Sequence, residues 1–333
     1  MADTRPTVWV SQPLIDAAIA PLRDRVQLRS TDAVTAWSPE QVAEQLDGVD
    51  GAIITLNERI GAAQVADAAQ LQVIANVGVG YNNLDVDALS AAGILASNTP
   101  DVLTETTADL GFALLMATAR RITESERWLR EGQWQQWSFQ TMLGADIHGS
   151  TLGILGMGRI GQGIARRGAH GFGMKVLYHN RSRLPAETEA ALGATYVDLD
   201  TLLAQSDHLV TVLPYTPASH HIIDAAALAK MRPSATLVNI ARGGIVDELA
   251  LADALARGRL AAAGLDVYEG EPAVRPELLA LRNVVLTPHI GSASLHTRRA
   301  MAALTVDNLI AALGKGPNAG RPPTPVNPEV LTL

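Results

Sequence analysis

The sequence predicts an α/β protein with two domains, each built on a doubly wound parallel sheet. Short apolar runs alternate with helical patterns through the first hundred residues and again after residue 150. Such alternation is typical of parallel strands that are joined by helices packed on the sheet. The length of 333 residues is sufficient for two hydrophobic cores. A strand, a glycine-rich turn, a helix and a second strand begin in mid-chain, so the N-terminal sheet must belong to a separate domain.

The first domain is predicted from the alternation of apolar runs and helical patterns. The expected strands are residues 7–10, 51–55, 73–77 and 94–96, and the expected helices between them are 39–46 and 61–69. The apolar spacing over 101–131 predicts one long helix. A segment rich in Trp, Gln and Gly follows at 132–149.

The stretch 151–161, TLGILGMGRIG, carries the most specific signal in the chain. Its apolar run ends in Gly156, Gly158 and Gly161, and a helical pattern and a second apolar run follow. In a Rossmann unit the first glycine permits the tight turn, the second lets the backbone approach a pyrophosphate, and the third lets the helix pack on the strand. The stretch therefore predicts dinucleotide binding, with Arg159 and Ile160 of the same turn beside the cofactor.

The end of the second strand indicates which dinucleotide is bound. An NAD site usually has an Asp or Glu here for the ribose hydroxyls. This chain instead continues as Asn180-Arg181-Ser182-Arg183, and no carboxylate follows before Glu187. Because guanidinium groups match a 2′-phosphate in charge and geometry, we predict NADP(H). The alternative interpretation is an ordinary basic loop in solvent.

The alternation resumes after the fingerprint. The expected strands are 175–178, 208–212, 236–240, 263–267 and 284–287, and the expected helices are 186–192, 224–230, 247–257 and 292–313. The tail from Pro317 carries five prolines and is expected to be extended. We predict a Rossmann domain, 103–290, inserted in a flavodoxin-like substrate domain formed by 1–102 and 291–333. Two long helices would cross between the domains, and the active site would lie in the cleft.

Composition excludes several classes of protein. The net charge of −8 argues against nucleic-acid binding. No apolar run is long enough to span a bilayer, and the first residues contain no apolar leader segment, so we expect neither a membrane nor a secretory protein. The chain has no cysteine, which excludes disulfides and thiolate metal sites and fits a cytoplasmic location.

Three segments after the fingerprint carry groups that can do chemistry. Each follows an apolar strand: 238–244 contains Arg242, 264–272 contains Glu269 and Glu271, and 287–291 contains His289. Reduction of a ketone by a hydride donor needs a proton donor, which a histidine can be. A neighbouring carboxylate favours its charged form, and an arginine can hold a substrate carboxylate. Taken singly, the arginine fits a surface ion pair and the glutamates fit an acidic loop.

The chain resembles the D-isomer-specific 2-hydroxyacid dehydrogenases over nearly its whole length. The resemblance rests on VGVGYNNLD (77–85), TETTADLGFALL (104–115), GMGRIG (156–161), NIARGGIVDE (239–248), GLDVYEGEP (264–272) and TPHIGSAS (287–294). Within that family, the YHNRSR loop and the GQWQQW segment look most like glyoxylate/hydroxypyruvate reductases and the related 2-ketogluconate reductases.

The resemblance implies a role for individual residues. Arg242 corresponds to the arginine that binds the substrate carboxylate and carbonyl, His289 to the acid/base, and Glu271 rather than Glu269 to its partner. The other residues that it places beside the substrate are Val79 and Gly80, through their amides, with Leu56, Ser292 and Trp137. Those that it places beside the cofactor, besides the fingerprint and the basic loop, are Thr107, Pro214, Ile240, Asp266 and Gly291. Asn76 stands where some members carry an arginine, which indicates a site that tolerates hydroxylated substrates.

The function predicted on this basis is NADPH-dependent reduction of a small 2-oxoacid to the D-2-hydroxyacid. The alternative is a dinucleotide-sensing binding protein, like the corepressors that share the fold, and a third is formate or phosphite oxidation. We also predict a homodimer through the long helix and the tryptophans of 101–149. A metal at His220 and His221 is not expected, because adjacent histidines point in different directions on most backbones and no acidic cluster is nearby to complete a site.

Overall fold

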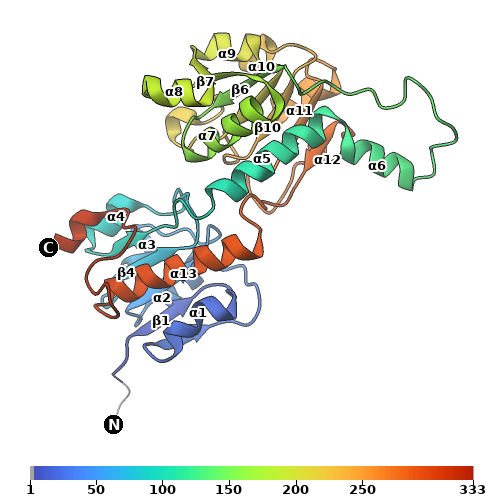
Figure 1. Ribbon diagram of the computed structural model, residues 1–333. Coiled ribbons are helices and arrows are strands. Elements are labelled where there is room, and N and C mark those ends of the chain that lie inside the picture. The colour runs from blue at the N-terminus through green and yellow to red at the C-terminus, as the bar shows by residue number, and fades with distance from the viewer. Residues whose placement is uncertain (1–3, 333) are drawn as a thin grey trace. The chain divides into compact units, whose positions relative to one another are not determined.

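The protein is described by a computed structural model covering residues 4–332, and residues 1–3 and 333 of the predicted first domain lie outside the described part (Figure 1). The chain divides into two compact units. The second unit is Thr104–Ser292, and the first takes the residues before Thr104 and those from Ala293 onward. The predicted boundaries, 102/103 and 290/291, differ from this division by one and two residues respectively.

The first unit is built on a five-stranded parallel sheet in the order β2-β1-β3-β4-β5. Its strands are β1 (Thr7–Val10), β2 (Gln27–Ser30), β3 (Gly51–Ile54), β4 (Val73–Asn76) and β5 (Leu95–Ser97). The central strands β3 and β4 are buried at every position, as expected for a sheet covered on both faces. This strand order is that of the flavodoxin-like fold.

Helices cover both faces of this sheet. They are α1 (Asp16–Arg23), α2 (Pro39–Leu46), α3 (Ala62–Val65), α4 (Val86–Ala91) and α13 (Leu295–Ala312). The last helix, α13, returns from the far end of the chain to pack on α1, β3 and β4. The tail then pairs with β5 through Pro325 and ends in a 3-10 turn at Pro328–Thr332, so it is extended only in part.

The second unit is built on a seven-stranded parallel sheet in the order β12-β11-β10-β9-β6-β7-β8. Its strands are β6 (Thr151–Leu155), β7 (Lys175–His179), β8 (Ala194–Tyr196), β9 (His208–Thr211), β10 (Thr236–Asn239), β11 (Ala262–Leu265) and β12 (Val284–Leu286). Six of these strands follow the Rossmann order, and β12 extends the sheet at one edge. The prediction of two parallel α/β sheets is confirmed.

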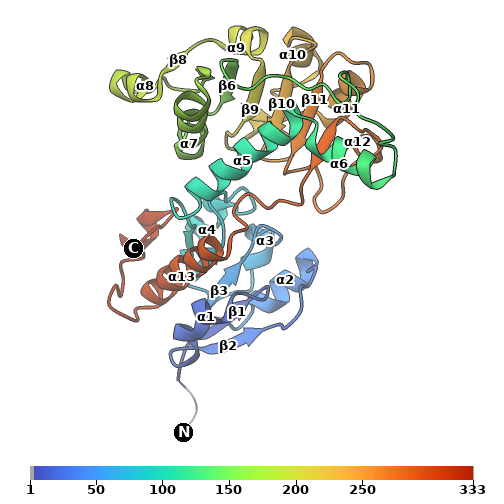
Figure 2. The same cartoon turned by 45° about the vertical axis from the view of Figure 1, so that its right-hand side comes forward.

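The helices of the second unit also lie on both faces of their sheet (Figure 2). They are α5 (Thr104–Ala119), α6 (Ile122–Arg130), α7 (Arg159–Arg166), α8 (Ala186–Leu192), α9 (Leu199–Gln205), α10 (Ala225–Lys230), α11 (Glu248–Ala256) and α12 (Pro276–Leu279). Helices α5 and α7 share one core with the sheet, and α9, α10 and α11 share the other. Aspartates cap α9, α10 and α11, and these caps fix where the helices begin.

The single helix predicted over 101–131 is wrong. The structure has two helices, α5 and α6, broken at Arg121, which lies in the left-handed region with φ 53°. The reason is that the apolar pattern stops there: α5 has eight buried residues and α6 has none. Short elements at β2, β8, α1, α4, α9 and α12 were also missed, because their apolar patterns are too brief to stand out.

Helix α6 and the segment after it extend away from the sheet of the second unit (Figure 1). Residues 131–148 form no helix or strand. No helix among residues 4–332 is both long and apolar enough to cross a membrane.

Candidate active site

The candidate catalytic residues follow three neighbouring strands of the second sheet. Arg242 follows β10, Glu271 follows β11 and His289 follows β12. Because β10, β11 and β12 are adjacent and parallel, their carboxyl ends lie at the same end of the sheet, and the three segments lie side by side although they are far apart in sequence.

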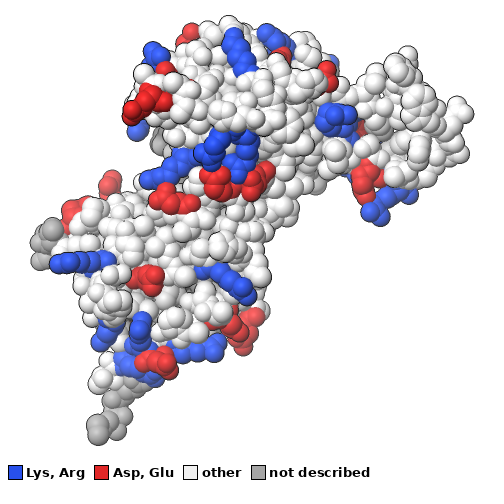
Figure 3. All heavy atoms as spheres, viewed as in Figure 1, with Lys and Arg blue, Asp and Glu red and all other residues white. Residues whose placement is uncertain are grey.

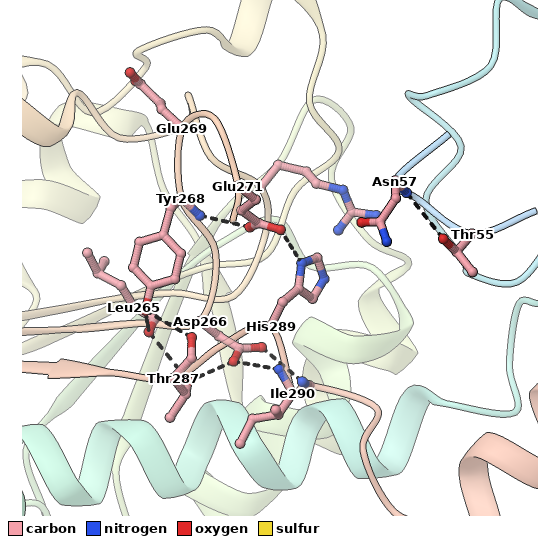
Figure 4. Close-up of polar contacts among 12 residues, drawn as sticks. Thr55, Asn57, Leu265, Asp266, Tyr268, Glu269, Glu271, Thr287, His289 and Ile290 are labelled. Carbon is pink, nitrogen blue, oxygen red and sulfur yellow. Dashed lines mark hydrogen bonds and ion pairs between the residues drawn. The ribbon is translucent and has the colours of Figure 1, made fainter. Parts of the chain in front are cut away.

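His289 and Glu271 form a direct pair (Figure 4). The histidine Nδ1 lies 2.8 Å from the glutamate Oε2, and both side chains are about a quarter exposed. Burial alone would raise the pKa of Glu271, but the hydrogen bond and charge of His289, the amide of Tyr268 and the charge of Arg242 outweigh it and lower that pKa. The carboxylate is therefore ionised at neutral pH and can stabilise an imidazolium.

Glu269 does not take part in this pair. Its side chain points away from His289 in Figure 4, whereas the Glu271 side chain points toward it. Glu271 is also held from behind, since its Oε1 accepts a hydrogen bond of 2.9 Å from the Tyr268 amide. The geometry thus distinguishes the two glutamates that residue type alone left equivalent.

Arg242 lies in a turn that Asn239 braces. The Asn239 side chain donates to the Arg242 carbonyl at 3.1 Å and accepts from the Ala241 amide at 3.0 Å. Burial lowers the pKa of Arg242 and the charge of Glu271 opposes that shift, but a guanidinium remains protonated at neutral pH. The bracing role of Asn239 was missed, although an Asn at the end of a strand and before two glycines is a recognisable turn signal.

Asp266 organises the loop that carries His289. Its Oδ1 accepts hydrogen bonds from the Thr287 hydroxyl at 2.6 Å and the Ile290 amide at 2.8 Å, and its Oδ2 accepts one from the Gly291 amide at 2.9 Å. Burial raises the pKa of Asp266, and these three donors with the charge of His289 oppose the shift. His289 has φ 52°, a conformation that the loop must hold in place.

The residues expected around the nicotinamide lie near one another. A Cβ built on Gly291 would be 3.3 Å from both Asp266 Oδ2 and Thr107 Cγ2. Ile240 lies against the same helix as Thr107, since its Cδ1 is 2.7 Å from a Cβ built on Gly111. Pro214 follows β9, and its carbonyl accepts a hydrogen bond from the Ser219 hydroxyl.

The glycine fingerprint has a shape that fits a dinucleotide. Gly156 has φ 104°, and a Cβ on it would lie 2.8 Å from the Leu213 backbone. A Cβ on Gly161 would lie 2.3 Å from the Gly156 carbonyl oxygen, so only glycine allows α7 to pack here. A Cβ on Gly158, by contrast, meets nothing within 4 Å. This open backbone before the N-terminus of α7, with Arg159 and Ile160 in its first turn, is the cradle a pyrophosphate requires.

The basic loop after β7 differs from the prediction in one respect. Arg183 is bound by Glu189, which returns from α8, with contacts of 2.9 Å and 2.7 Å, and the Tyr178 hydroxyl donates to the same carboxylate at 2.6 Å. Asn180 donates to the Ser182 carbonyl. Arg181 is exposed and makes no hydrogen bond or ion pair with any residue that the structure describes. Of the two arginines, Arg183 is thus held within the protein and Arg181 is not.

In the predicted substrate loop of the first unit, the backbone carbonyls are hydrogen-bonded within the protein and two of the amides are not. The carbonyls of Gly78, Val79 and Gly80 accept from the Thr99 amide, the Asn98 side chain and the Asn76 side chain, at 2.9, 2.8 and 2.9 Å. Within residues 4–332, no hydrogen bond uses the amides of Val79 or Gly80. Two amides left in this way can bind a carboxylate.

Asn76 is a buried brace for this loop, being 1% exposed. Its side chain donates to the Gly80 carbonyl, and the expectation of a site that tolerates hydroxylated substrates stays a prediction. Leu56 is 37% exposed and belongs to a loop that the buried carboxylate of Glu58 holds through the Thr55 amide and hydroxyl.

The remaining predicted substrate residues are less closely tied to the site. Ser292 is half-buried and lies three residues after His289. Trp137 is 74% exposed and packs only edge-on against Phe139.

The premise that the side chains of His220 and His221 point apart is wrong. The two rings stack with centroids 3.9 Å apart, and His221 contacts the carboxylate of Glu269. No group of three or more His, Cys, Asp or Glu side chains in the described part of the chain is arranged to hold a metal.

The fold and this set of groups define an oxidoreductase of the D-2-hydroxyacid dehydrogenase class. Residues 112–291 match the model of the family described as D-isomer specific 2-hydroxyacid dehydrogenase, NAD binding domain. The chain belongs to this family, and the resemblance seen in its motifs is confirmed.

Several relatives align with nearly the full length of the chain. The chain is 45% identical to a glyoxylate reductase of Thermococcus onnurineus, over 99% of this chain and 98% of that protein. It is 42% identical to glyoxylate/hydroxypyruvate reductase B of Escherichia fergusonii, over 93% of this chain and 95% of that one. Among solved structures, an NADPH-dependent glyoxylate/hydroxypyruvate reductase of Sinorhizobium meliloti, in complex with NADP and malonate, is similar with a TM-score of 0.85 and 35% identity, covering 97% of each chain.

Proposed function

We propose that this protein uses NADPH to reduce a small 2-oxoacid of the glyoxylate, hydroxypyruvate or 2-ketogluconate type to the D-2-hydroxyacid. The observation that carries the proposal is the pair of His289 and Glu271 at the sheet edge that also bears Arg242, in a chain whose relatives are glyoxylate reductases. The corepressor-like alternative is not favoured by these relatives.

The roles of the residues follow from their chemistry. When bound, the reduced nicotinamide supplies a hydride to the carbonyl carbon of the substrate. His289 donates the proton that the carbonyl oxygen takes up, and Glu271 stabilises the imidazolium until then. Arg242 binds the substrate carboxylate and polarises the carbonyl. The amides of Val79 and Gly80, in the first unit, are also suited to a carboxylate.

The test of this function is a panel of 2-oxoacids assayed with NADPH and with NADH. We expect the highest kcat/KM with NADPH and one of glyoxylate, hydroxypyruvate or 2-ketogluconate, and a D-configured product where the product is chiral. Turnover of none of the three would remove the proposal, and a much higher kcat/KM for a bulky apolar 2-oxoacid would remove the substrate class.

The cofactor preference is expected to depend on Arg181. A hydrogen bond to a charged group contributes about 1.5–3 kcal/mol, which corresponds to on the order of 10- to 100-fold in affinity. We expect kcat/KM to be at least about tenfold higher with NADPH than with NADH. Arg181→Ala should reduce this ratio by raising the KM for NADPH, with little change for NADH, and the effect should shrink at high salt.

Arg183→Ala is the matched control, because Glu189 already binds that guanidinium. It should change the NADPH preference less than Arg181→Ala does. If the unmodified enzyme has the same kcat/KM with NADPH and NADH, the loop is instead an ordinary basic segment in solvent.

We also propose that the protein is a homodimer through α6 and the segment after it. Ile122, Leu129, Trp134, Trp137, Phe139 and Leu143 are each at least half exposed. Figure 3 shows that the outer part of this projection carries few charged side chains. Because exposed apolar surface of this extent usually marks an interface, a second copy of the chain is its expected partner.

The double variant Trp137→Ser/Phe139→Ser tests the dimer. We expect sedimentation at micromolar concentration to give a dimer for the unmodified chain and a monomer for the variant, while Val34→Ser, an equally exposed apolar residue in the other unit, leaves the dimer intact. An unmodified chain that sediments as a fully active monomer would contradict the proposal.

A further inference from the structure

His221 contacts both backbone segments that carry catalytic groups. Its amide donates a 2.7 Å hydrogen bond to the carbonyl of Gly244, in the turn of Arg242. Its ring Nε2 lies 2.5 Å from Oε1 of Glu269, in the loop of Glu271. One residue from outside both segments therefore joins them.

The two segments are in direct backbone contact at this point. A Cβ built on Gly243 would lie 1.9 Å from the carbonyl oxygen of Tyr268, so the turn of Arg242 and the loop of Glu271 pack without any side chain between them. A small displacement of either segment would change the distance between Arg242 and the pair of Glu271 and His289. The contacts of His221 with Gly244 and Glu269 oppose such a displacement.

Glu269 is fixed by more than His221. Its amide donates to Oε1 of the buried Glu248 at 2.6 Å, and its Oε2 lies 2.9 Å from the Arg275 guanidinium. Burial would raise the pKa of Glu269, but the hydrogen bonds from Arg275 and His221 outweigh it and lower that pKa. The carboxylate is therefore an ionised anchor between two donors, and its side chain points away from His289 (Figure 4).

The conformation of His221 indicates that these contacts hold it. Its φ is 49°, a value that residues other than glycine rarely adopt. His220 stacks on the His221 ring and is itself hydrogen-bonded to the Tyr215 hydroxyl. The Asp247 carboxylate lies 4.0 Å from Nδ1 of His221. Backbone strain of this kind persists only where the surroundings compensate for it.

We propose that His221 is a positioning residue of the active site, which fixes the turn of Arg242 relative to the loop of Glu271 through Gly244 and Glu269. The inference rests on the proposed roles of Arg242, Glu271 and His289. In this role His221 contacts neither the substrate nor the cofactor. Its loss should therefore lower kcat, which depends on the alignment of the catalytic groups, and leave cofactor affinity unchanged.

The experiment compares kcat, KM and the dissociation constant of NADPH for His221→Ala, Glu269→Gln and the double variant. We expect His221→Ala to lower kcat by about tenfold, because small misplacements of catalytic groups reduce rates to this extent or more. The double variant should be no slower than the slower single variant, since both changes break one contact. His221→Gln, whose side-chain amide can also donate to Glu269, should recover most of kcat.

His148→Ala removes an exposed histidine of the same unit that has no part in the site, so it is the matched control and should keep kcat near that of the unmodified enzyme. An unchanged kcat in His221→Ala would overturn the inference, as would a variant whose only change is a lower melting temperature. A loss of kcat in the double variant equal to the product of the two single losses would also overturn it. If His221→Ala does not fold, Glu269→Gln and His221→Gln decide by the same criteria. Failure of the proposed function is separate, because the unmodified enzyme would then turn over none of the three 2-oxoacids, whereas failure of this inference leaves the unmodified enzyme active.

Discussion

Replacement of His289 by alanine is expected to lower kcat for 2-oxoacid reduction by about 10²- to 10⁴-fold, the range typical of the loss of a general acid. The expectation rests on the 2.8 Å contact with Glu271, which orients the ring and stabilises its charged form. The melting temperature and the affinity for NADPH should stay near those of the unmodified enzyme, because the ring is about a quarter exposed. A variant that keeps near-normal kcat would remove His289 from the mechanism.

The pH dependence supplies a second measurement of the same role. Reduction takes up a proton, which His289 delivers, so kcat/KM for reduction should fall as the pH rises. Oxidation of the hydroxyacid releases that proton and should show the opposite slope. On the acid side, the lowered pKa of Glu271 keeps its carboxylate ionised down to and below the ordinary value of 4.5, so it should cause no loss between there and neutrality. Profiles with the same slope in both directions would contradict the assignment.

Replacement of Arg242 by alanine is expected to lower kcat/KM by about 10²- to 10⁴-fold. The physical reason is that two charge-assisted contacts are lost, to the carboxylate and to the carbonyl, each contributing about 1.5–3 kcal/mol. Because the carboxylate contact acts in the ground state and the carbonyl contact strengthens in the transition state, KM should rise and kcat should fall. Steady-state kinetics of the best substrate of the panel gives both parameters.

Arg242→Lys is the control for charge without fork geometry. It should recover part of the KM and little of kcat, because an ammonium group cannot bind two acceptors in one plane. A rise in KM alone in Arg242→Ala would limit the arginine to substrate binding. Unchanged KM and kcat in that variant would remove Arg242 from the site.

The order of the elements was predictable from the sequence because most of them have their own local signal. The glycines of the fingerprint, the aspartate caps and the fully apolar strands are local, and each specifies its element without reference to the rest of the chain. The helix over 101–131 was predicted wrongly, because the break at Arg121 depends on where the core ends and not on a glycine or proline.

The candidate catalytic residues could be named from the sequence because each follows an apolar strand. Parallel strands in one sheet bring their carboxyl ends together, so an arginine, a glutamate and a histidine could be expected at one end of the sheet without coordinates. The sequence could not separate Glu269 from Glu271 except by resemblance. The two carboxylates are identical in chemistry, and only the direction of the loop gives one to His289 and the other to His221 and Arg275.

The sequence by itself therefore determined the class of fold, the cofactor cradle and the types of residue at the site. Only the tertiary structure decided which of these side chains form hydrogen bonds or ion pairs within the protein. Glu189 takes Arg183 from the basic loop, Asn76 turns inward to its own loop, and Asp266 holds the loop of His289. The physical reason is that a hydrogen bond or ion pair depends on distance and direction in space, and residues four to more than twenty positions apart in sequence acquire these only when the chain folds.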